Sequence, residues 1–377
     1  MFKKTPPMGW NSWNTFGADI NEKLIFETAD IMADRGLLSH GYEYLVIDDC
    51  WSLKTRDANG RLVPDPEKFP NGMKAVADYV HSKGLKFGMY SCAGNLTCAG
   101  YPGSYEHEFI DAQTFAEWGV DFLKYDYCFH SNIVHGKYLY RRMGLALENC
   151  GRDILFSACS WGADETHKWI KETSASMWRS TGDIFDSWES IKELTKQQNE
   201  KFAYNGVGCF NDMDMLVVGM YGKGNVGLSG CSDVQYKTHF SIWALLGSPL
   251  MIGCDVRNMT DEAYRILTND EIIKINQDPA CRQVVKIEGI WGNEDIPVYY
   301  RQLTGGDVAI GIFNFKNEKV SPTFNLDEIG LPHSTGKTLE MHELWTGDKF
   351  TVENSNVRRT IEPYGCEVFR AKIVDIK

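Results

Sequence analysis

Aspartate side chains gather at the carboxyl ends of the apolar segments of this chain. The acidic residues at these ends are Asp48, Asp49, Asp126, Asp183, Asp212, Asp214 and Asp255. Two basic residues, Lys124 and Arg179, lie near the carboxyl ends of two of these apolar segments. Two carboxylates can share the nucleophile and acid/base roles of glycoside hydrolysis, and further charged groups can bind sugar hydroxyls. The pattern therefore favours a glycosidase.

Two other interpretations account for the same aspartates. Clustered carboxylates can hold Mg²⁺ or Ca²⁺, but neither a phosphate cradle nor a calcium-loop motif accompanies them. An aspartate at a strand end can also cap the next helix, as we expect for Asp111 and Asp186. Asp126 does not open a helical pattern, because aromatic and polar residues follow it at 127–130.

The composition excludes several classes of protein. The 377 residues carry 51 acidic and 39 basic side chains, and this net charge of −12 argues against nucleic acid or anionic membranes as partners. The 11 tryptophans, 17 tyrosines and 19 phenylalanines suit a large core and equally suit a cleft in which flat rings stack on sugars. A small-molecule or glycan substrate fits this composition better than a nucleic acid does.

The elements that must position these residues alternate along the first three quarters of the chain. Continuous apolar runs, typical of strands buried on both faces of a parallel sheet, cover residues 8–16, 42–51, 85–92, 120–128, 154–161, 177–183, 209–216 and 249–255. Helical patterns separate them, including residues 186–199, 232–247 and 268–278. Eight strand–helix units predict a (β/α)8 barrel, with an unusually wide doubly wound sheet as the alternative. In such a barrel the strand ends form the active-site rim.

The last quarter of the chain has a different pattern. Alternating strands are expected at 296–303, 307–315, 339–345, 349–352 and 357–361, with Gly305 and Gly306 in a hairpin turn. We therefore expect a catalytic barrel over residues 1–285 and a C-terminal antiparallel β-sandwich over residues 286–377. Its expected role is structural.

A glycine-rich segment follows the seventh apolar run. Residues 222–227 match the dinucleotide-binding pattern G-x-G-x-x-G, but the next helical pattern starts only near Ser232, so we expect a rim loop.

The N-terminal residues 1–7 lack the apolar stretch of a secretion signal, and the 11 scattered cysteines are typical of reduced thiols. We expect a cytoplasmic protein, or a secreted one if a leader was removed, with no metal and no cofactor. A homo-oligomer is compatible with the sequence.

Six motifs in order closely resemble glycoside hydrolase family 27, which contains α-galactosidases and α-N-acetylgalactosaminidases. They lie at residues 7–11, 47–51, 98–104, 124–128, 178–188 and 211–216. The resemblance runs from Pro7 to about Pro279 and continues more weakly through the tail. The family has a barrel followed by a β-sandwich, in agreement with the pattern of elements.

The resemblance implies a double displacement with retention of configuration. Asp126 would be the nucleophile and Asp183 the acid/base. Asp126 would have to stay ionised beside Lys124, whereas Asp183 would have to hold a proton near neutral pH.

The resemblance also implies a set of sugar-binding residues: Trp13, Asp48, Asp49, Tyr90 and Lys124 on the O3, O4 and O6 side, and Arg179 and Asp214 on the O2 side. Cys98 and Cys128 match a disulfide of secreted members, and the sequence leaves that bond open.

One departure from the family pattern bears on the substrate. The α-galactosidases carry Cys-Glu-Trp after the fifth strand, where this chain has Cys159, Ser160 and Trp161, and Ala163 replaces a bulkier leucine of animal enzymes. Small residues leave room for an N-acetyl group, and the lost glutamate removes an acceptor for a free hydroxyl. We therefore predict an exo-acting α-N-acetylgalactosaminidase, whose partner is a terminal α-galactosaminide of an oligosaccharide or glycoconjugate. The alternatives are an α-galactosidase, a β-L-arabinopyranosidase and a catalytically silent sugar-binding barrel.

Overall fold

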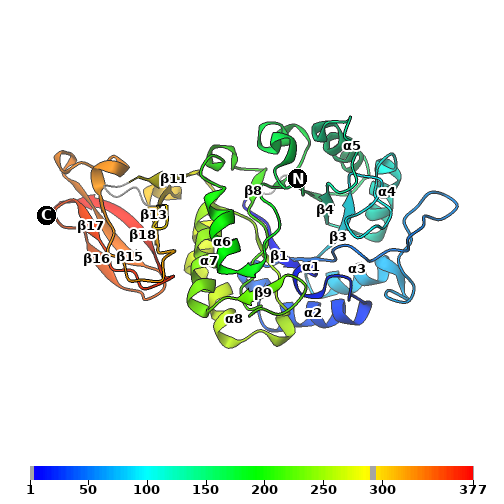
Figure 1. Cartoon of the computed structure of the whole chain (residues 1–377), viewed down its shortest axis with the longest axis horizontal. Helices are drawn as coiled ribbons and strands as arrows, with labels where there is room; N and C mark the ends of the chain where they lie inside the picture. Colours follow the sequence, from blue (N-terminus) through cyan, green and yellow to red (C-terminus); the bar gives the residue numbers. More distant parts are fainter. Residues whose placement is uncertain (1–3, 289–293, 377) are drawn as a thin grey trace.

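The computed structural model describes residues 4–288 and 294–376. Residues 1–3, on which the expectation about a leader partly depends, lie outside the described residues. Figure 1 shows a barrel ringed by helices and, beside it, a smaller domain of β-strands that contains the C-terminus. Within the described part of the chain, no helix is both long and apolar enough to span a membrane.

Eight parallel strands form the barrel sheet in the order β10-β1-β2-β3-β4-β5-β6-β8. They are β1 (Met8–Asn11), β2 (Tyr44–Val46), β3 (Lys86–Cys92), β4 (Phe122–Asp126), β5 (Leu155–Ala158), β6 (Met177–Arg179), β8 (Phe210–Asp212) and β10 (Leu250–Ile252). A parallel bridge between Leu216 and Ile252 links the two ends of this order. The predicted barrel is confirmed.

Helices surround the barrel, and the short α1 (Trp13–Phe16) lies at its rim. The others are α2 (Glu22–Asp34), α3 (Gly72–Ser82), α4 (Glu108–Trp118), α5 (Gly136–Glu148), α6 (Trp188–Lys196), α7 (Asp233–Leu246), α8 (Asp261–Leu267) and α9 (Asp270–Asn276). The fifth strand is followed instead by two short 3₁₀ helices at Ala163–Lys168 and Ile170–Glu172. Asp164 and Glu165 adopt left-handed backbone angles there, which prevents a continuous α-helix.

Serine side chains cap the N-termini of two of the predicted helices. Ser232 forms a capping box with Gln235 at the start of α7, and Ser187 accepts the N–H of Ser190 at the start of α6. The expectation that Asp186 and Asp111 cap helices is wrong. The buried Asp186 lies in the short strand β7 (Asp186–Ser187) and accepts hydrogen bonds from Gly222 and Tyr236.

Asp111 lies in the first turn of α4, after the N-cap residue His107. Its carboxylate forms an ion pair of 2.6 Å with Arg56. Both buried aspartates therefore accept hydrogen bonds from other parts of the chain instead of capping a helix.

The C-terminal domain contains one large and one small antiparallel sheet. The large sheet has the order β11 (Val284–Ile287), β12 (Val298–Gln302), β13 (Val308–Phe313), β18 (Cys366–Asp375), β15 (Lys337–Glu343) and β16 (Lys349–Thr351). The small sheet pairs β14 (Thr323–Asn325) with β17 (Asn356–Arg358). Phe324 and Val357 pack against Ile310, Leu339 and Phe369 of the large sheet, which completes a sandwich core.

The central strand β18 was not predicted, although its residues partly alternate between buried and exposed positions. The hairpin around Gly305 and Gly306 does join β12 to β13. We propose a domain boundary just before β11, close to the expected division at residue 285.

The barrel and the sandwich pack together through α6 and α7, which lie on the barrel side that faces the C-terminal domain (Figure 1). Thr238 in α7 donates to the carbonyl of Tyr364 at 2.7 Å, and Trp345 donates to Ser241 at 3.1 Å. These contacts attach the sandwich to the barrel flank.

Candidate active site

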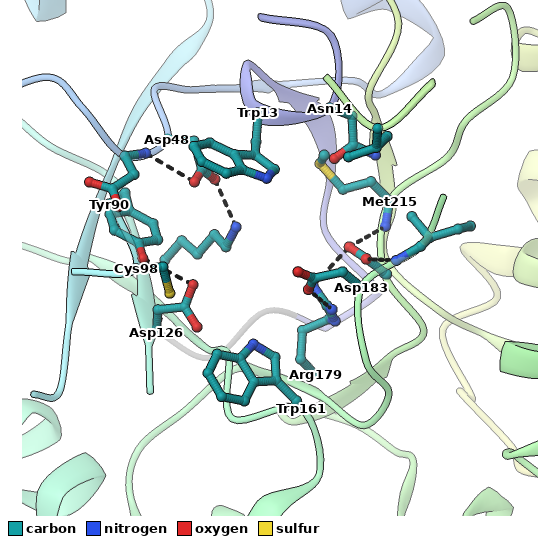
Figure 2. A pocket seen from close by; sticks show the side chains of 15 residues that line it. Trp13, Asn14, Asp48, Tyr90, Cys98, Asp126, Trp161, Arg179, Asp183 and Met215 are labelled. Carbon is teal, nitrogen blue, oxygen red and sulfur yellow. Dashed lines mark hydrogen bonds and ion pairs between the residues drawn. The ribbon is translucent and has the colours of Figure 1, made fainter. Parts of the chain in front are cut away.

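A cavity opens at the carboxyl ends of the barrel strands (Figure 2). It contains about 470 Å³ of space that is continuous with solvent. All but three of the predicted site residues line it. Those that do are Trp13, Asp48, Asp49, Tyr90, Lys124, Asp126, Trp161, Arg179, Asp183 and Asp214. The parallel strands bring these residues together because all their carboxyl ends reach the same rim.

Asp126 is the last residue of β4 and is only 6% exposed. Its Oδ2 accepts a hydrogen bond of 3.0 Å from the Tyr90 hydroxyl, and its Oδ1 accepts one of 3.0 Å from the backbone N–H of Tyr127. Burial raises the pKa of Asp126 to about 6, and the positive charge of Lys124 offsets this effect only in part. The carboxylate is therefore firmly oriented and poorly solvated.

Lys124 and Asp48 form an ion pair beside Asp126, with Nζ and Oδ2 separated by 2.8 Å. Asn11 donates to the same Asp48 oxygen at 2.7 Å. Burial works against the charge of Lys124, but the negative charge of Asp48 outweighs it and raises the pKa of the lysine. This fixed network of one cation and its acceptors can bind adjacent hydroxyl groups of a sugar.

The carboxylate of Asp49 extends this polar wall. It accepts backbone N–H groups of Cys50 at 2.7 Å and of Ala99 at 3.0 Å. Burial raises the pKa of Asp49 despite these hydrogen bonds. Asp49 therefore joins the strand end after β2 to the rim loop that contains Ala99.

Asp183 lies across the cavity from Asp126, and Trp13 and Trp161 lie on two further sides (Figure 2). The Asp183 side chain is 61% exposed, and its Oδ1 accepts a hydrogen bond of 2.7 Å from Arg179. The buried Arg179 also contacts Asp214 Oδ1 at 2.8 Å. Asp214 Oδ2 accepts the N–H of Ile184 at 2.7 Å, so Asp214 holds the backbone next to Asp183 as well.

The pKa order of the two carboxyl groups is the reverse of the expected one. Burial alone would raise the pKa of Asp183, but the charge and hydrogen bond of Arg179 outweigh it and lower the pKa below 3.8. Asp126 has the higher pKa because burial raises it and the positive charge of Lys124, which is paired with Asp48, offsets that effect only in part. In the free protein, Asp183 therefore ionises before Asp126.

Cys159, Ser160 and Ala163 do not line this cavity in the described structure. Ser160 is completely buried, and its hydroxyl oxygen lies 2.6 Å from the hydroxyl oxygen of Thr166. Thr166 in turn donates to the carbonyl of Ala163. Cys159 lines a smaller adjoining cavity, which shares Lys124, Arg179, Asp214 and Met215 with the larger one. Of the two residues predicted to discriminate between substrates, Ser160 is thus buried away from the cavity, and Ala163 is not among the residues that line it.

Further cavity-lining side chains were not predicted: Asn14, Cys98, Ile184, Met215 and Val226. Ile184 and Met215 directly follow predicted aspartates, so their positions offered a signal. Val226 comes from the glycine-rich loop at 222–227, and its N–H donates to the carbonyl of Asn14 at 3.0 Å. No local pattern reveals this contact, because it joins segments more than 200 residues apart.

Asp212 is a buried acidic residue beneath the site. Its Oδ1 accepts the N–H of Asp214 at 2.9 Å, and Asp214 has a left-handed φ of 81°. Burial raises the pKa of Asp212 to about 6. Asp212 therefore supports the turn that aims Asp214 at Arg179.

Cys98 and Cys128 form a disulfide, with their Cα atoms 5.1 Å apart. The bond joins the rim loop after β3 to the residues after β4. Cys98 borders the cavity next to Asp126 (Figure 2). The pairing that the sequence leaves open is thus present in the structure.

Comparisons with known proteins agree with this architecture. Residues 5–278 match the family described as alpha galactosidase A, and residues 293–371 match the alpha galactosidase C-terminal beta sandwich domain. An alpha-galactosidase of Cyamopsis tetragonoloba is 42% identical over 97% of this chain and 86% of its own length. Alpha-galactosidase 3 of Arabidopsis thaliana is 44% identical over 97% of this chain and 81% of its own length.

A solved structure shows the same likeness in three dimensions. The alpha-galactosidase of Saccharomyces cerevisiae with raffinose superposes with a TM-score of 0.90 at 31% identity, covering 98% of each chain. The matches span both domains of the chain. The chain is therefore a glycoside hydrolase that belongs to the α-galactosidase family, glycoside hydrolase family 27.

Proposed function

We propose that this protein hydrolyses terminal α-galactosides with retention of the anomeric configuration. The observation that carries the proposal is a polar cavity in which Asp126 and Asp183 face each other (Figure 2). Relatives that align over nearly the whole chain are named alpha-galactosidases, and one solved relative contains raffinose. A cavity at the barrel rim suits the terminal sugar of a longer substrate.

In the first step, the Asp126 carboxylate attacks the anomeric carbon while the bond to the leaving oxygen breaks. Asp183 donates its proton to that oxygen, and a glycosyl ester on Asp126 remains. In the second step, ionised Asp183 takes a proton from water, the water oxygen attacks the anomeric carbon, and the Asp126 carboxylate leaves. The hydrogen bonds from Tyr90 and Tyr127 keep Asp126 aimed during both steps.

The competent form of the free enzyme has an ionised Asp126 and a protonated Asp183. Because Asp126 has the higher pKa, this form is a minority of the molecules, and its population is largest between the two pKa values. A minority form can still carry the reaction, because protons exchange quickly with solvent. The proposal therefore requires an acidic pH optimum.

The substrate assignment differs from the one predicted from the sequence. Ser160 and Ala163 favour an acetamido group only if they border the sugar, and the buried Ser160 hydroxyl contacts Thr166 instead. The named relatives support galactose. α-N-acetylgalactosaminidase activity stays the second candidate, because no acidic side chain at position 160 is available to bind a free O2 hydroxyl.

The test is the ratio of kcat/KM for the p-nitrophenyl α-glycosides of galactose and N-acetylgalactosamine. We expect galactose to be preferred by at least about tenfold, which corresponds to about 1.4 kcal/mol of transition-state binding. Preference for the N-acetyl sugar would overturn the galactosidase assignment. The first-formed sugar should be the α-anomer by NMR, and the Asp126→Asn variant should lose at least about 1,000-fold in kcat.

A further inference from the structure

The Cys98–Cys128 disulfide lies directly beside the proposed nucleophile. One ligand atom from each of Cys98, Cys128 and Asp126 lies within 4.8 Å of the other two. The Cys98 side chain is exposed and borders the cavity, whereas Asp126 is buried (Figure 2). A reductant in solution can therefore reach a sulfur atom that is next to the catalytic carboxylate.

The two cysteines stay close even without their covalent bond, because backbone hydrogen bonds hold the same loop. The N–H of Ala93 donates to the carbonyl of Asp126 at 2.9 Å, and the N–H of Asn95 donates to the carbonyl of Phe129 at 3.3 Å. Gly94 packs so tightly on this segment that an added Cβ would lie 2.0 Å from the carbonyl oxygen of Cys128. Reduction thus leaves two thiols near Asp126.

This group of ligands suits a thiophilic divalent cation. A dithiol reductant exchanges with the disulfide: its two thiols are oxidised to a disulfide, the Cys98–Cys128 bond breaks, and two protein thiols form. A cation such as Zn²⁺ then displaces both protons. Zinc binds cysteine sulfur at about 2.3 Å and carboxylate oxygen at about 2.0–2.2 Å in tetrahedral geometry.

Ligand atoms around such a cation are therefore less than about 4 Å apart. Small side-chain rotations bring the sulfur atoms of Cys98 and Cys128 and the carboxylate of Asp126 into that range. The fourth position is open to water from the cavity. The ammonium group of Lys124 does not oppose the cation strongly, because it is paired with Asp48.

We propose that reduction of the Cys98–Cys128 disulfide creates a zinc-type cation site, completed by the Asp126 carboxylate, and that a cation bound there blocks catalysis. The proposed cation binding depends only on the positions of Cys98, Cys128 and Asp126. The inhibition rests on the proposed function, since it requires Asp126 to be the nucleophile.

The first experiment measures binding without using activity. The full-length protein is reduced with dithiothreitol, freed of reductant by anaerobic gel filtration and titrated with Co²⁺. We expect the near-ultraviolet charge-transfer absorption of cobalt–thiolate bonds at about one Co²⁺ per chain in reduced protein, and no such absorption in oxidised protein. Zn²⁺ should remove the signal, because zinc competes for the same thiolates.

The second experiment measures kcat/KM for p-nitrophenyl α-galactoside. Micromolar free Zn²⁺ should lower the rate of the reduced enzyme at least about tenfold relative to the same preparation with EDTA, and EDTA should restore it. The oxidised enzyme should change by less than about twofold under the same conditions.

Matched variants separate this site from other thiols. The reduced Cys98→Ser/Cys128→Ser protein should show neither the cobalt absorption nor zinc inhibition relative to its own EDTA reference. The Cys150→Ser protein should behave as the wild type, because the Cys150 thiol donates to the carbonyls of Leu147 and Arg152 and does not line the cavity.

Absence of the cobalt absorption in reduced wild-type protein would overturn the proposal, whether or not the enzyme cleaves galactosides. Absorption without zinc inhibition, in an enzyme that is active, would also overturn it, because the carboxylate would then be free. If the protein fails to hydrolyse galactosides even in EDTA while the reduced protein still shows the cobalt absorption, only the proposed function would be refuted.

Discussion

The Asp126→Asn substitution should make the protein more stable at neutral pH while it abolishes catalysis. Burial raises the pKa of this carboxyl from an ordinary value of 3.8 to about 6. At 1.36 kcal/mol per pH unit, this difference corresponds to about 3 kcal/mol. Below pH 3.8 both the folded and the unfolded chain hold the proton, so folding carries no penalty.

The penalty appears as pH rises through the interval between 3.8 and about 6, because the unfolded chain ionises first. Above that interval the full penalty of about 3 kcal/mol weighs on the folded wild type. The asparagine variant carries no charge at any of these pH values. Its free energy of unfolding relative to wild type should therefore rise by about 2.5 kcal/mol between pH 4 and pH 7.5.

The assay is urea unfolding followed by tryptophan fluorescence at both pH values. Comparing the two pH values cancels the pH-independent cost of replacing one hydrogen-bonded oxygen of Asp126 by an amide nitrogen. Asp78→Asn is the control, because the Asp78 side chain is 61% exposed and the change should stay within about 0.5 kcal/mol at either pH. An equal stability difference at pH 4 and pH 7.5 would refute the argument, since it would mean that burial imposes no penalty on this charge.

Three further results are expected. The basic limb of the plot of kcat/KM against pH should lie near pH 6, because Asp126 carries the higher pKa of the catalytic pair. Above that pH, kcat/KM should fall about tenfold per pH unit. A plateau extending to pH 8 would contradict this. Asp214→Asn should lower kcat/KM by about 100-fold and shift the pH profile, because Arg179 loses its second carboxylate partner; an unchanged profile would contradict the positioning role. Ser160→Ala should change the ratio of kcat/KM for the galactose and N-acetylgalactosamine substrates by less than about twofold, because the Ser160 hydroxyl contacts Thr166 and not the cavity. The same variant should lower the free energy of unfolding, measured in urea, by about 1 kcal/mol. A large change in that ratio would show that Ser160 acts on the sugar.

Much of the architecture follows from local patterns in the sequence. Continuous apolar runs indicate strands that are buried on both faces, and such strands occur in parallel sheets covered by helices. A barrel of parallel strands aligns all their carboxyl ends, so the polar residues after each run had to meet at one rim. Asp48, Lys124, Asp126 and Arg179 therefore meet at that rim as a consequence of parallel topology alone.

The direction of individual side chains required the tertiary structure. Cys159 and Trp161 face the two adjoining cavities, whereas Ser160 between them faces Thr166. The three residues alternate as in a strand, but the sequence alone does not show which of the two alternating sets faces the cavity. The substrate prediction depended on this direction, and for that reason the sequence was a poor guide to it.

The charge states were also decided by tertiary contacts. The sequence shows that Lys124 is two residues from Asp126 but does not show that its ion pair is with Asp48. Nor does it show that Arg179 donates to Asp183, a contact that keeps that carboxyl ionised to low pH. Sequence by itself determined which strands and which charged residues meet at the rim, because those depend on hydrophobic periodicity and parallel topology. Only the tertiary structure decided which charges pair, because ion pairing and desolvation depend on distances of a few ångströms between segments far apart in the chain.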